Sequence, residues 1–244
     1  MPEGPTIVLL KEETRSFKNK KILEVEGNVK TIHKEILLDQ KIIDIKSWGK
    51  HFLICFKGFT IKIHFLMFGS YLINGEKSTP VRLGLTFANG TINFYSCMVK
   101  LLEGNINDHY DWSSDVMNET WDEKKALKKL KDKPNTLACD ALLDQDIFGG
   151  VGNIIKNEVL YRVKVNPKSK VGKIPPAKLK EMISEASIYS FQFLEWKRKF
   201  ELKKHWLAHT KKTCERCDLP LIKEYLGVTN RRTFYCKNCQ KLYK

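Results

Sequence analysis

The sequence has no long hydrophobic run. Its longest apolar stretches, such as Phe52–Phe56 and Phe65–Phe68, are far shorter than the roughly 18–20 residues that cross a bilayer. The N-terminus has no basic region followed by an apolar stretch, so we expect no secretory signal peptide. Internal repeats and low-complexity tracts are also absent, and 42% apolar with 29% charged residues excludes a disordered or collagen-like chain. We therefore expect a folded protein without a membrane segment.

Acidic residues are scarce relative to basic ones, and the imbalance lies in one half of the chain. The 244 residues include 43 Lys+Arg and 28 Asp+Glu, a formal net charge of +15. Residues 1–120 carry 15 basic and 14 acidic side chains, whereas residues 121–244 carry 28 and 14. This asymmetry indicates a polyanionic partner, with nucleic acid favoured over an anionic membrane surface.

The patterning predicts an α+β multidomain protein. Short β-branched or aromatic segments predict strands at 21–26, 41–46, 52–56, 60–65 and 70–73, and Asn89-Gly90 centres a hairpin over 84–95. Helical spacing follows at 123–131 and 135–143, from the glycine-rich turn 149–153 to Tyr161, and at 177–194. We predict an N-terminal antiparallel β-sandwich or barrel over 1–112, a helical basic domain over 113–210 and a small finger over 211–244.

Two C-x-x-C pairs predict a metal site in the last 34 residues. Four thiolates at this spacing can surround one zinc ion, and their number leaves no open position for a catalytic water. The alternatives are two disulfides or a redox pair, but an odd total of seven cysteines fits a reduced protein better. The expected ligands are Cys214, Cys217, Cys236 and Cys239, and Cys55, Cys97 and Cys139 are expected to be buried, inert thiols.

Segments 221–225 and 232–235 are expected to be the two strands of this finger, so we predict a zinc β-hairpin with one structural ion. Metal binding would supply the folding energy of so small a module. Arg231 and Arg232 fall near its predicted tip, where a guanidinium can bind a phosphate. Solvated surface charge is the alternative role, above all for Arg232.

The N-terminus begins Met1-Pro2-Glu3-Gly4-Pro5. Removal of Met1 would leave Pro2 as a free secondary amine, and an α-amino group titrates near ~8, well below lysine. Such an amine can attack a sugar C1′ and form an iminium that serves as an electron sink, with Glu3 beside it to transfer protons. By itself this start is weak evidence, because many chains begin Met-Pro.

The N-terminal pentapeptide, the basic helical half, the Gly149–Asn153 turn and the terminal four-cysteine finger together resemble the formamidopyrimidine-DNA glycosylase/endonuclease VIII family. They occur in the family's order over nearly the whole chain. The resemblance implies an N-terminal β-sandwich, a helix–two-turns–helix DNA-binding element and a zinc finger, with DNA held between domains. It also implies excision of an oxidised base followed by nicking of the abasic strand.

The resemblance implies roles for individual residues. Pro2 matches the family's nucleophile and Glu3 the acid that assists opening of the sugar ring. Lys50, within Ser47–Leu53, matches an essential lysine that holds a phosphate or supports elimination, although a lysine at a hairpin is otherwise simply exposed. Asn153 and Arg231 fall where the family binds phosphate; without the family, the 149–153 run is only a turn and a helix cap.

Leu66, Met67 and Phe68 fall where the family fills the gap left by a flipped nucleotide. Turning a base out of the duplex costs a few kcal/mol, and an apolar side chain commonly takes its place. The competing interpretation is that an apolar run in a sandwich belongs to its core. The turn-forming Gly69-Ser70 favours the functional role.

Several departures point to the endonuclease VIII-like branch. Phe94–Lys100 replaces the Asp-x-Arg-x-Phe-Gly stretch of the formamidopyrimidine branch, and 141–145 is closer to the endonuclease VIII pattern. The segment before Cys214 is short, so we expect oxidised pyrimidines to be preferred over oxidised guanine. Thr6 stands where many relatives carry a second glutamate.

The sequence therefore predicts a bifunctional DNA glycosylase and abasic-site lyase, ending in β- or β,δ-elimination. We expect a monomer with no membrane partner, located in the cytoplasm with the nucleoid and acting on damaged DNA, most simply duplex. The alternative is a catalytically inactive zinc-finger protein that binds damaged DNA. An RNA-binding protein has weaker support, because the sheet lacks closely spaced exposed aromatic residues.

Overall fold

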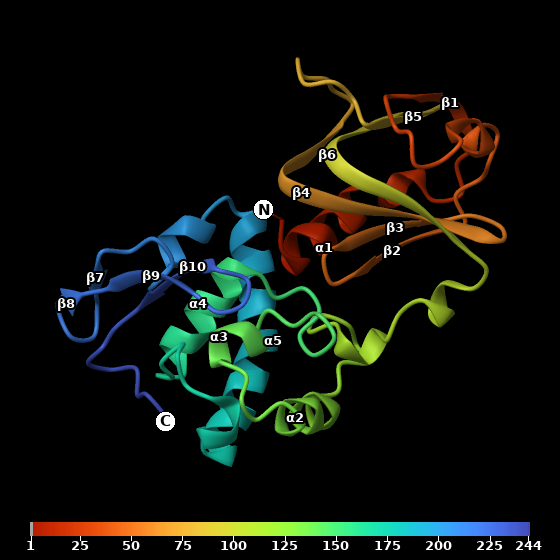
Figure 1. Cartoon of the computed structure of the whole chain (residues 1–244). Coiled ribbons are helices and arrows are strands. Elements are labelled where there is room, and N and C mark those ends of the chain that lie inside the picture. The colour runs from red at the N-terminus through yellow and green to blue at the C-terminus, as the bar shows by residue number, and fades with distance from the viewer. Residues whose placement is uncertain (1) are drawn as a thin grey trace. The chain divides into compact units, whose positions relative to one another are not determined.

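The computed structural model describes residues 2–244. The chain divides into two compact units, one ending at Tyr110 and the other running from Asp111 to Lys244 (Figure 1). No described helix is both long and apolar enough to cross a membrane.

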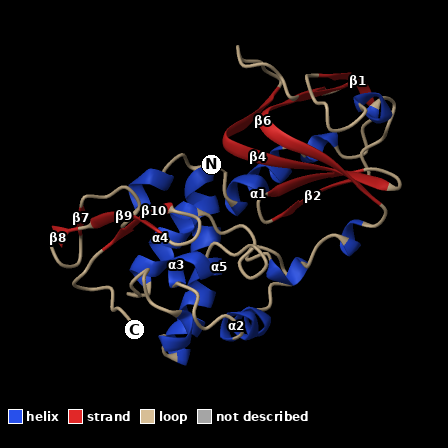
Figure 2. Ribbon diagram, viewed as in Figure 1, coloured by secondary structure: helices blue, strands red, loops and turns tan. Residues whose placement is uncertain are grey.

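The first unit is an antiparallel sheet with one helix packed against it (Figure 2). The strand order is β1-β5-β6-β4-β3-β2, and the N-terminal antiparallel sheet expected from the sequence is confirmed. The elements are α1 (Gly4–Glu13), β1 (Ile22–Glu26), β2 (Asp44–Trp48), β3 (His51–Cys55), β4 (Phe59–Ile73), β5 (Leu83–Phe87) and β6 (Gly90–Glu103). Short 3-10 turns occupy Arg15–Phe17, Lys34–Leu37 and Ile106–Asp108.

Apolar residues of α1 and of the strands form the core of this unit. Proline lies in the first turn of α1, where its missing N–H costs nothing, and Ile7 and Leu10 are fully buried against the sheet. The expected strands 60–65 and 70–73 are two parts of the single long strand β4, because both parts pair with β6. The expected strand 41–46 instead begins at Asp44.

The second unit is helical and carries the finger. Its elements are α2 (Glu123–Lys131), α3 (Ala138–Ala141), α4 (Asn153–Arg162), α5 (Pro176–Arg198), β7 (Thr213–Cys214), β8 (Leu219–Pro220), β9 (Ile222–Leu226) and β10 (Arg231–Tyr235), with 3-10 turns at Trp112–Ser114, Val171–Lys173 and Leu202–His205. The α3 helix is shorter than the expected 135–143, because Leu137 has extended backbone and forms a bridge with Lys170. Helices α4 and α5 supply much of the buried core.

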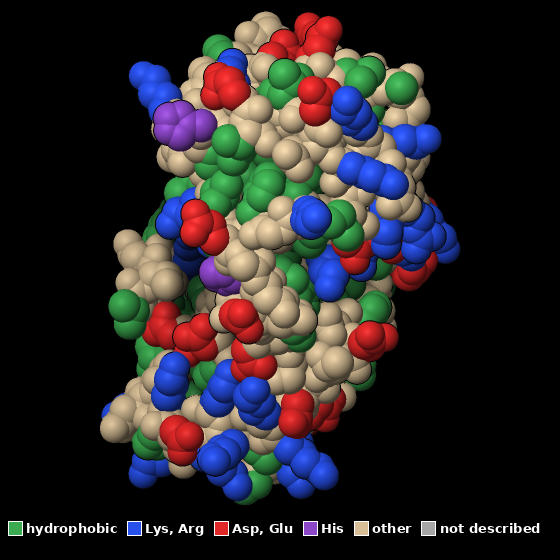
Figure 3. Space-filling view, turned by 90° about the vertical axis from the view of Figure 1, so that its right-hand side faces the viewer, with side chains coloured by type: hydrophobic (Ala, Val, Ile, Leu, Met, Phe, Trp, Pro, Cys, Tyr) green, Lys and Arg blue, Asp and Glu red, His purple; other side chains and the backbone are tan. Residues whose placement is uncertain are grey.

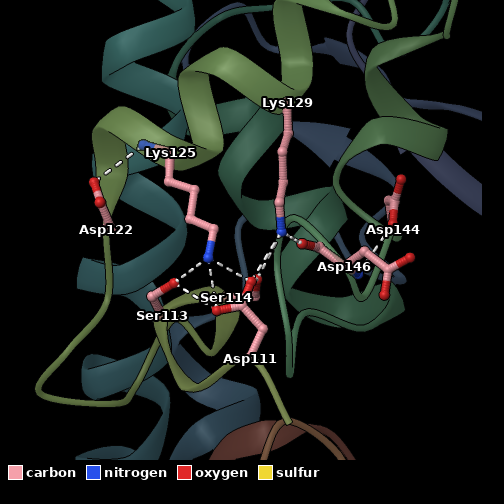
Figure 4. Close-up of polar contacts among 8 residues, drawn as sticks. All are labelled: Asp111, Ser113, Ser114, Asp122, Lys125, Lys129, Asp144 and Asp146. Atoms are coloured by element: carbon pink, nitrogen blue, oxygen red, sulfur yellow. Dashed lines mark hydrogen bonds and ion pairs between the residues drawn. The ribbon is translucent and has the colours of Figure 1, made fainter.

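A cluster of polar side chains anchors the beginning of the second unit to α2 (Figure 4). The Asp111 carboxylate accepts hydrogen bonds from the Ser113 and Ser114 hydroxyls at 2.6 and 2.8 Å. Lys125 and Lys129 bring their ammonium groups to within 2.7 and 3.2 Å of the same carboxylate. Burial alone would raise the pKa of Asp111, but these four donors outweigh it and hold that pKa well below its usual range.

We expect Asp111→Asn to destabilise the protein in a pH-dependent way. A depressed aspartate pKa contributes stability above the unfolded value of about 3.9, and that contribution is lost as pH falls through the folded pKa. The Asp111 side chain is still 39% exposed, so solvent screening limits the loss to about 1 kcal/mol at pH 7. Urea denaturation from pH 7 to pH 3 measures it.

The control is Asp108→Asn, which removes an equal charge from an exposed 3-10 turn and should leave the free energy of unfolding nearly unchanged. An Asp111→Asn deficit that persists undiminished at pH 3 would contradict the electrostatic explanation.

Candidate functional site

The chain's N-terminal residues lie at the beginning of α1. Glu3 is the N-cap residue of the helix, and its carbonyl accepts the Thr6 N–H at 2.9 Å. Its side chain makes no hydrogen bond that caps the helix, yet the residue is only 2% exposed. Pro2 precedes it and is half-buried. The residue next to the predicted nucleophile in the sequence is therefore a buried carboxylic acid.

Lys50 lies in the two-residue turn between β2 and β3. The pairing of Trp48 with His51 closes this hairpin, and the Lys50 side chain is half-buried. The His64 Nδ1 and the Lys50 carbonyl oxygen are 3.2 Å apart, so a ring N–H on Nδ1 donates to that carbonyl. The neighbouring strand β4 therefore fixes the backbone on which Lys50 stands.

A group of rings that the sequence patterns do not predict lies beside this turn. The Tyr110 hydroxyl lies 3.1 Å from the His51 Nδ1, and the Trp48 and Tyr110 ring centroids are 5.0 Å apart. Burial first, and then the nearby Lys62, lowers the pKa of His51 to about 3. His51 is therefore neutral at pH 7 and adds no positive charge beside Lys50. The sequence feature that could have drawn attention to His51 is its position directly after Lys50.

Leu66, Met67 and Phe68 lie in a bulge of β4. The ladder between β4 and β6 runs to the Phe65–Cys97 pair and resumes at Ser70–Tyr95. The bulge exposes 46%, 56% and 83% of the three apolar side chains in order. A Cβ on Gly69 would lie 2.7 Å from the Phe65 Cβ and 2.8 Å from the Ser96 carbonyl oxygen, so glycine permits this tight return. The core interpretation of these three residues does not hold.

Asn153 begins α4 directly after the glycine-rich turn. Gly150 has a φ of +98°, a conformation that side chains disfavour. The Asn153 Nδ2 donates to the Arg232 carbonyl at 2.9 Å, so the first turn of α4 contacts β10 of the finger. Arg231 begins β10, pairs with Leu226 and is half-buried. The structure thus places Asn153 beside the strand that carries Arg231.

The four cysteines of the two C-x-x-C pairs lie together. Their sulfur atoms are all within 4.8 Å of one another, and Cys214 and Cys239 have Sγ atoms 3.7 Å apart. A tetrahedron with metal–sulfur bonds of about 2.3 Å requires sulfur separations of about 3.8 Å, whereas a disulfide requires about 2.05 Å. The cluster is therefore suited to hold a metal ion rather than two disulfides.

Polar groups surround the sulfur atoms. The Arg216 Nη2 donates to Cys239 and the Asn238 Nδ2 to Cys217, both at 3.2 Å. The Tyr161 hydroxyl, from the end of α4, lies 3.2 Å from the Cys214 Sγ. Hydrogen bonds of this kind stabilise thiolate charge and orient metal ligands. They also connect the cluster to α4.

Comparison with known proteins identifies the family. Residues 1–99 match the model of the formamidopyrimidine-DNA glycosylase N-terminal domain, and residues 113–188 match the model of the formamidopyrimidine-DNA glycosylase H2TH domain. The chain belongs to the formamidopyrimidine-DNA glycosylase/endonuclease VIII family. Pro2, Glu3, Lys50 and the bulge lie within the first match and Asn153 within the second, while the cysteine cluster lies beyond both.

Relatives come from both branches of the family. Endonuclease 8-like 3 of Mus musculus is 28% identical over 207 residues, 81% of this chain and 34% of that protein. The chain thus spans about a third of the length of such relatives. Formamidopyrimidine-DNA glycosylase of Lactobacillus helveticus is 29% identical over 283 residues, covering 100% of this chain and 99% of that protein.

Solved structures share the fold. A formamidopyrimidine-DNA glycosylase from Lactococcus lactis, bound non-covalently to DNA containing an abasic site, matches with a TM-score of 0.86 at 20% identity, over 98% of this chain and 99% of that one. A viral DNA glycosylase matches with a TM-score of 0.84 at 23% identity, over 98% and 100%. At 20–23% identity, these likenesses show that the fold is shared over 98% of this chain.

Proposed function

We propose that the protein is a base-excision repair DNA glycosylase with abasic-site lyase activity. The observation that carries the proposal is that Glu3, the residue directly after Pro2, is buried at the beginning of α1, in a chain of this family. Residues 1–112 would carry the chemistry, and 113–210 together with the finger 211–244 would bind DNA. The protein would act inside the cell, as a monomer, on damaged duplex DNA.

The chemistry follows from a secondary amine at the chain terminus. The Pro2 nitrogen bonds to the sugar C1′ while the bond from C1′ to the base breaks, and the base leaves with a proton. Glu3 donates a proton to the ring oxygen as the sugar opens, which leaves a positively charged iminium. Removal of a C2′ proton then expels the 3′ phosphate, and hydrolysis releases Pro2. Lys50 would hold the neighbouring phosphate or support the elimination, which proceeds by the β or β,δ route.

We expect borohydride to trap a covalent adduct between Pro2 and an abasic-site duplex. Pro2→Gly, or protein that retains Met1, should lower the trapped fraction by about a hundredfold or more, because the positioned secondary amine is lost. Denaturing electrophoresis of the cross-linked DNA measures it.

The matched control is Pro80→Gly, which makes the same substitution at an exposed loop position and should trap normally. Absence of an adduct in protein whose N-terminal Pro2 is verified by mass spectrometry would instead favour the alternative, a catalytically inactive zinc-finger protein that binds damaged DNA.

Phosphate and gap contacts complete the proposal. Asn153 supplies an amide N–H at a helix N-terminus, where the orphan backbone amides also favour anions, and Arg231 supplies a guanidinium. The exposed Leu66, Met67 and Phe68 would fill the space of the flipped nucleotide. Basic and acidic side chains are interspersed on the face shown in Figure 3. DNA binding would therefore depend on the individual contacts of Asn153 and Arg231 in addition to net charge.

We expect oxidised pyrimidines to be released faster than oxidised guanine. Only 15 residues separate the end of α5 at Arg198 from Cys214, which leaves little room for a loop that folds over a purine. The preference is measured as the single-turnover rate of base release from two duplexes, one containing thymine glycol and the other containing 8-oxoguanine opposite cytosine. Faster release of 8-oxoguanine would place the chain with the purine-specific branch.

The metal of the cysteine cluster is proposed to be one structural zinc ion. Four thiolates favour zinc, and the bound ion would supply folding energy to the finger. All four ligands come from the protein, so the ion has no open position for catalysis.

We expect one zinc per chain by elemental analysis. Cys217→Ser should lose that zinc and reduce DNA affinity at least about tenfold, because the finger strand that carries Arg231 loses its fold. Cys55→Ser, a substitution outside the cluster, serves as the control and should keep one equivalent. Full zinc retention in Cys217→Ser would contradict the assignment.

A further inference from the structure

Three consecutive polar residues of α4 are fully buried, namely Lys156, Asn157 and Glu158. Burying charged groups is expensive unless partners compensate them. These side chains contact the finger and the segment that precedes it. Glu158 accepts the backbone N–H groups of Leu207, Ala208 and His209 at 2.7–3.0 Å.

Asn157 also has a structural contact. Its Oδ1 accepts the Phe234 N–H at 3.0 Å, which fixes β10 to the middle of α4. Asn157 thus attaches the finger to α4, and Glu158 attaches the segment that precedes the finger. Lys156 differs from both in that its ammonium group donates to two side chains.

The Lys156 Nζ donates to the Asn153 Oδ1 at 2.9 Å and to the Thr233 Oγ1 at 2.7 Å. An ammonium group can only donate hydrogen bonds. It therefore selects the amide orientation in which the Asn153 oxygen faces inward and the Nδ2 faces away. The Nδ2 indeed donates to the Arg232 carbonyl, and an amide nitrogen carries a second N–H.

Thr233 holds the lysine in this position. Its hydroxyl accepts from Lys156 and in turn donates to the Arg231 carbonyl at 3.0 Å. The donor directions are therefore consistent from Lys156 through Thr233 to the backbone of β10. Thr233 is fully buried, so water does not compete for these bonds.

We propose that Lys156 is a positioning residue for DNA binding, which acts by orienting the Asn153 amide so that its N–H meets a backbone phosphate. The inference rests on the proposed function, because it needs the protein to bind DNA. Without Lys156 the Asn153 oxygen loses its donor and the Arg232 carbonyl alone holds the amide, so the remaining N–H is presented to a phosphate less precisely. The ligand concerned is the phosphodiester backbone beside the lesion.

The test is equilibrium binding to a duplex that carries a stable abasic-site analogue, measured over a range of salt concentrations. Lys156→Met keeps an unbranched side chain, one heavy atom shorter, but removes the donor. We expect about a tenfold loss of affinity with an unchanged salt slope, because the lost amide contact is neutral and releases no counterion, and a catalytic defect that falls on KM rather than on kcat.

A double-mutant cycle separates positioning from a general structural role. In an Asn153→Ala background, Lys156→Met should cause no further loss of affinity, because the amide that it orients is gone. Lys180→Met removes an exposed lysine of α5 and is the matched control, whose small effect should be the same in both backgrounds. If Lys156 is only structural, its loss will add fully to that of Asn153→Ala.

Thr233→Val provides a second double-mutant cycle if Lys156→Met does not fold. This substitution keeps the side-chain volume but removes the hydroxyl that holds Lys156. We expect a severalfold loss of affinity in the wild-type background and no further loss in the Asn153→Ala background. Additive losses, or full affinity in Lys156→Met, overturn the inference and leave the proposed function intact. A wild-type protein that does not bind the duplex overturns the proposed function itself.

Discussion

The attachment of the finger depends on buried polar contacts with α4, because the finger has little apolar core. Its hydrophobic cluster has two buried residues of the finger, Cys214 and Cys236, packed with Tyr161 of α4 and Ala208 of the preceding segment. Instead, the Glu158 carboxylate accepts hydrogen bonds from three consecutive backbone N–H groups of the segment that precedes the finger in the sequence. A buried amide left without an acceptor costs about 1–3 kcal/mol. The metal cluster can therefore shape the finger, but α4 decides where the finger lies within its unit.

The proposed catalytic residues are likewise held at the ends of rigid elements. The buried Ile7 and Leu10 fix α1 against the sheet, and Glu3 begins that helix. Lys50 lies in a tight turn whose carbonyl contacts His64 of the neighbouring strand. At the end of a fixed element the backbone position is well defined and the side chain is still accessible to a substrate. Catalysis requires both.

Local patterns predicted most of the elements, and motifs predicted most of the candidate site. The α2 helix matches its predicted bounds because Asp122 caps it and the helical spacing is regular. Segment 135–137 could not be placed from propensity, because the partner of Leu137 is Lys170, far along the chain. The contacts of Lys156 and of the ring pair His51–Tyr110 were missed for the same reason. Each depends on residues that only tertiary structure brings together.

The bulge of β4 exposes side chains that take no part in the pairing of the sheet. The Phe65–Cys97 and Ser70–Tyr95 pairs fix the register on either side. The residues between them are not paired with β6, so the register does not depend on their side chains. Substitutions at 66–68 can change the apolar surface offered to a ligand without shifting the alternation of β4 or β6. The fold thus contains a replaceable segment through which recognition can diversify among descendants while the framework stays constant.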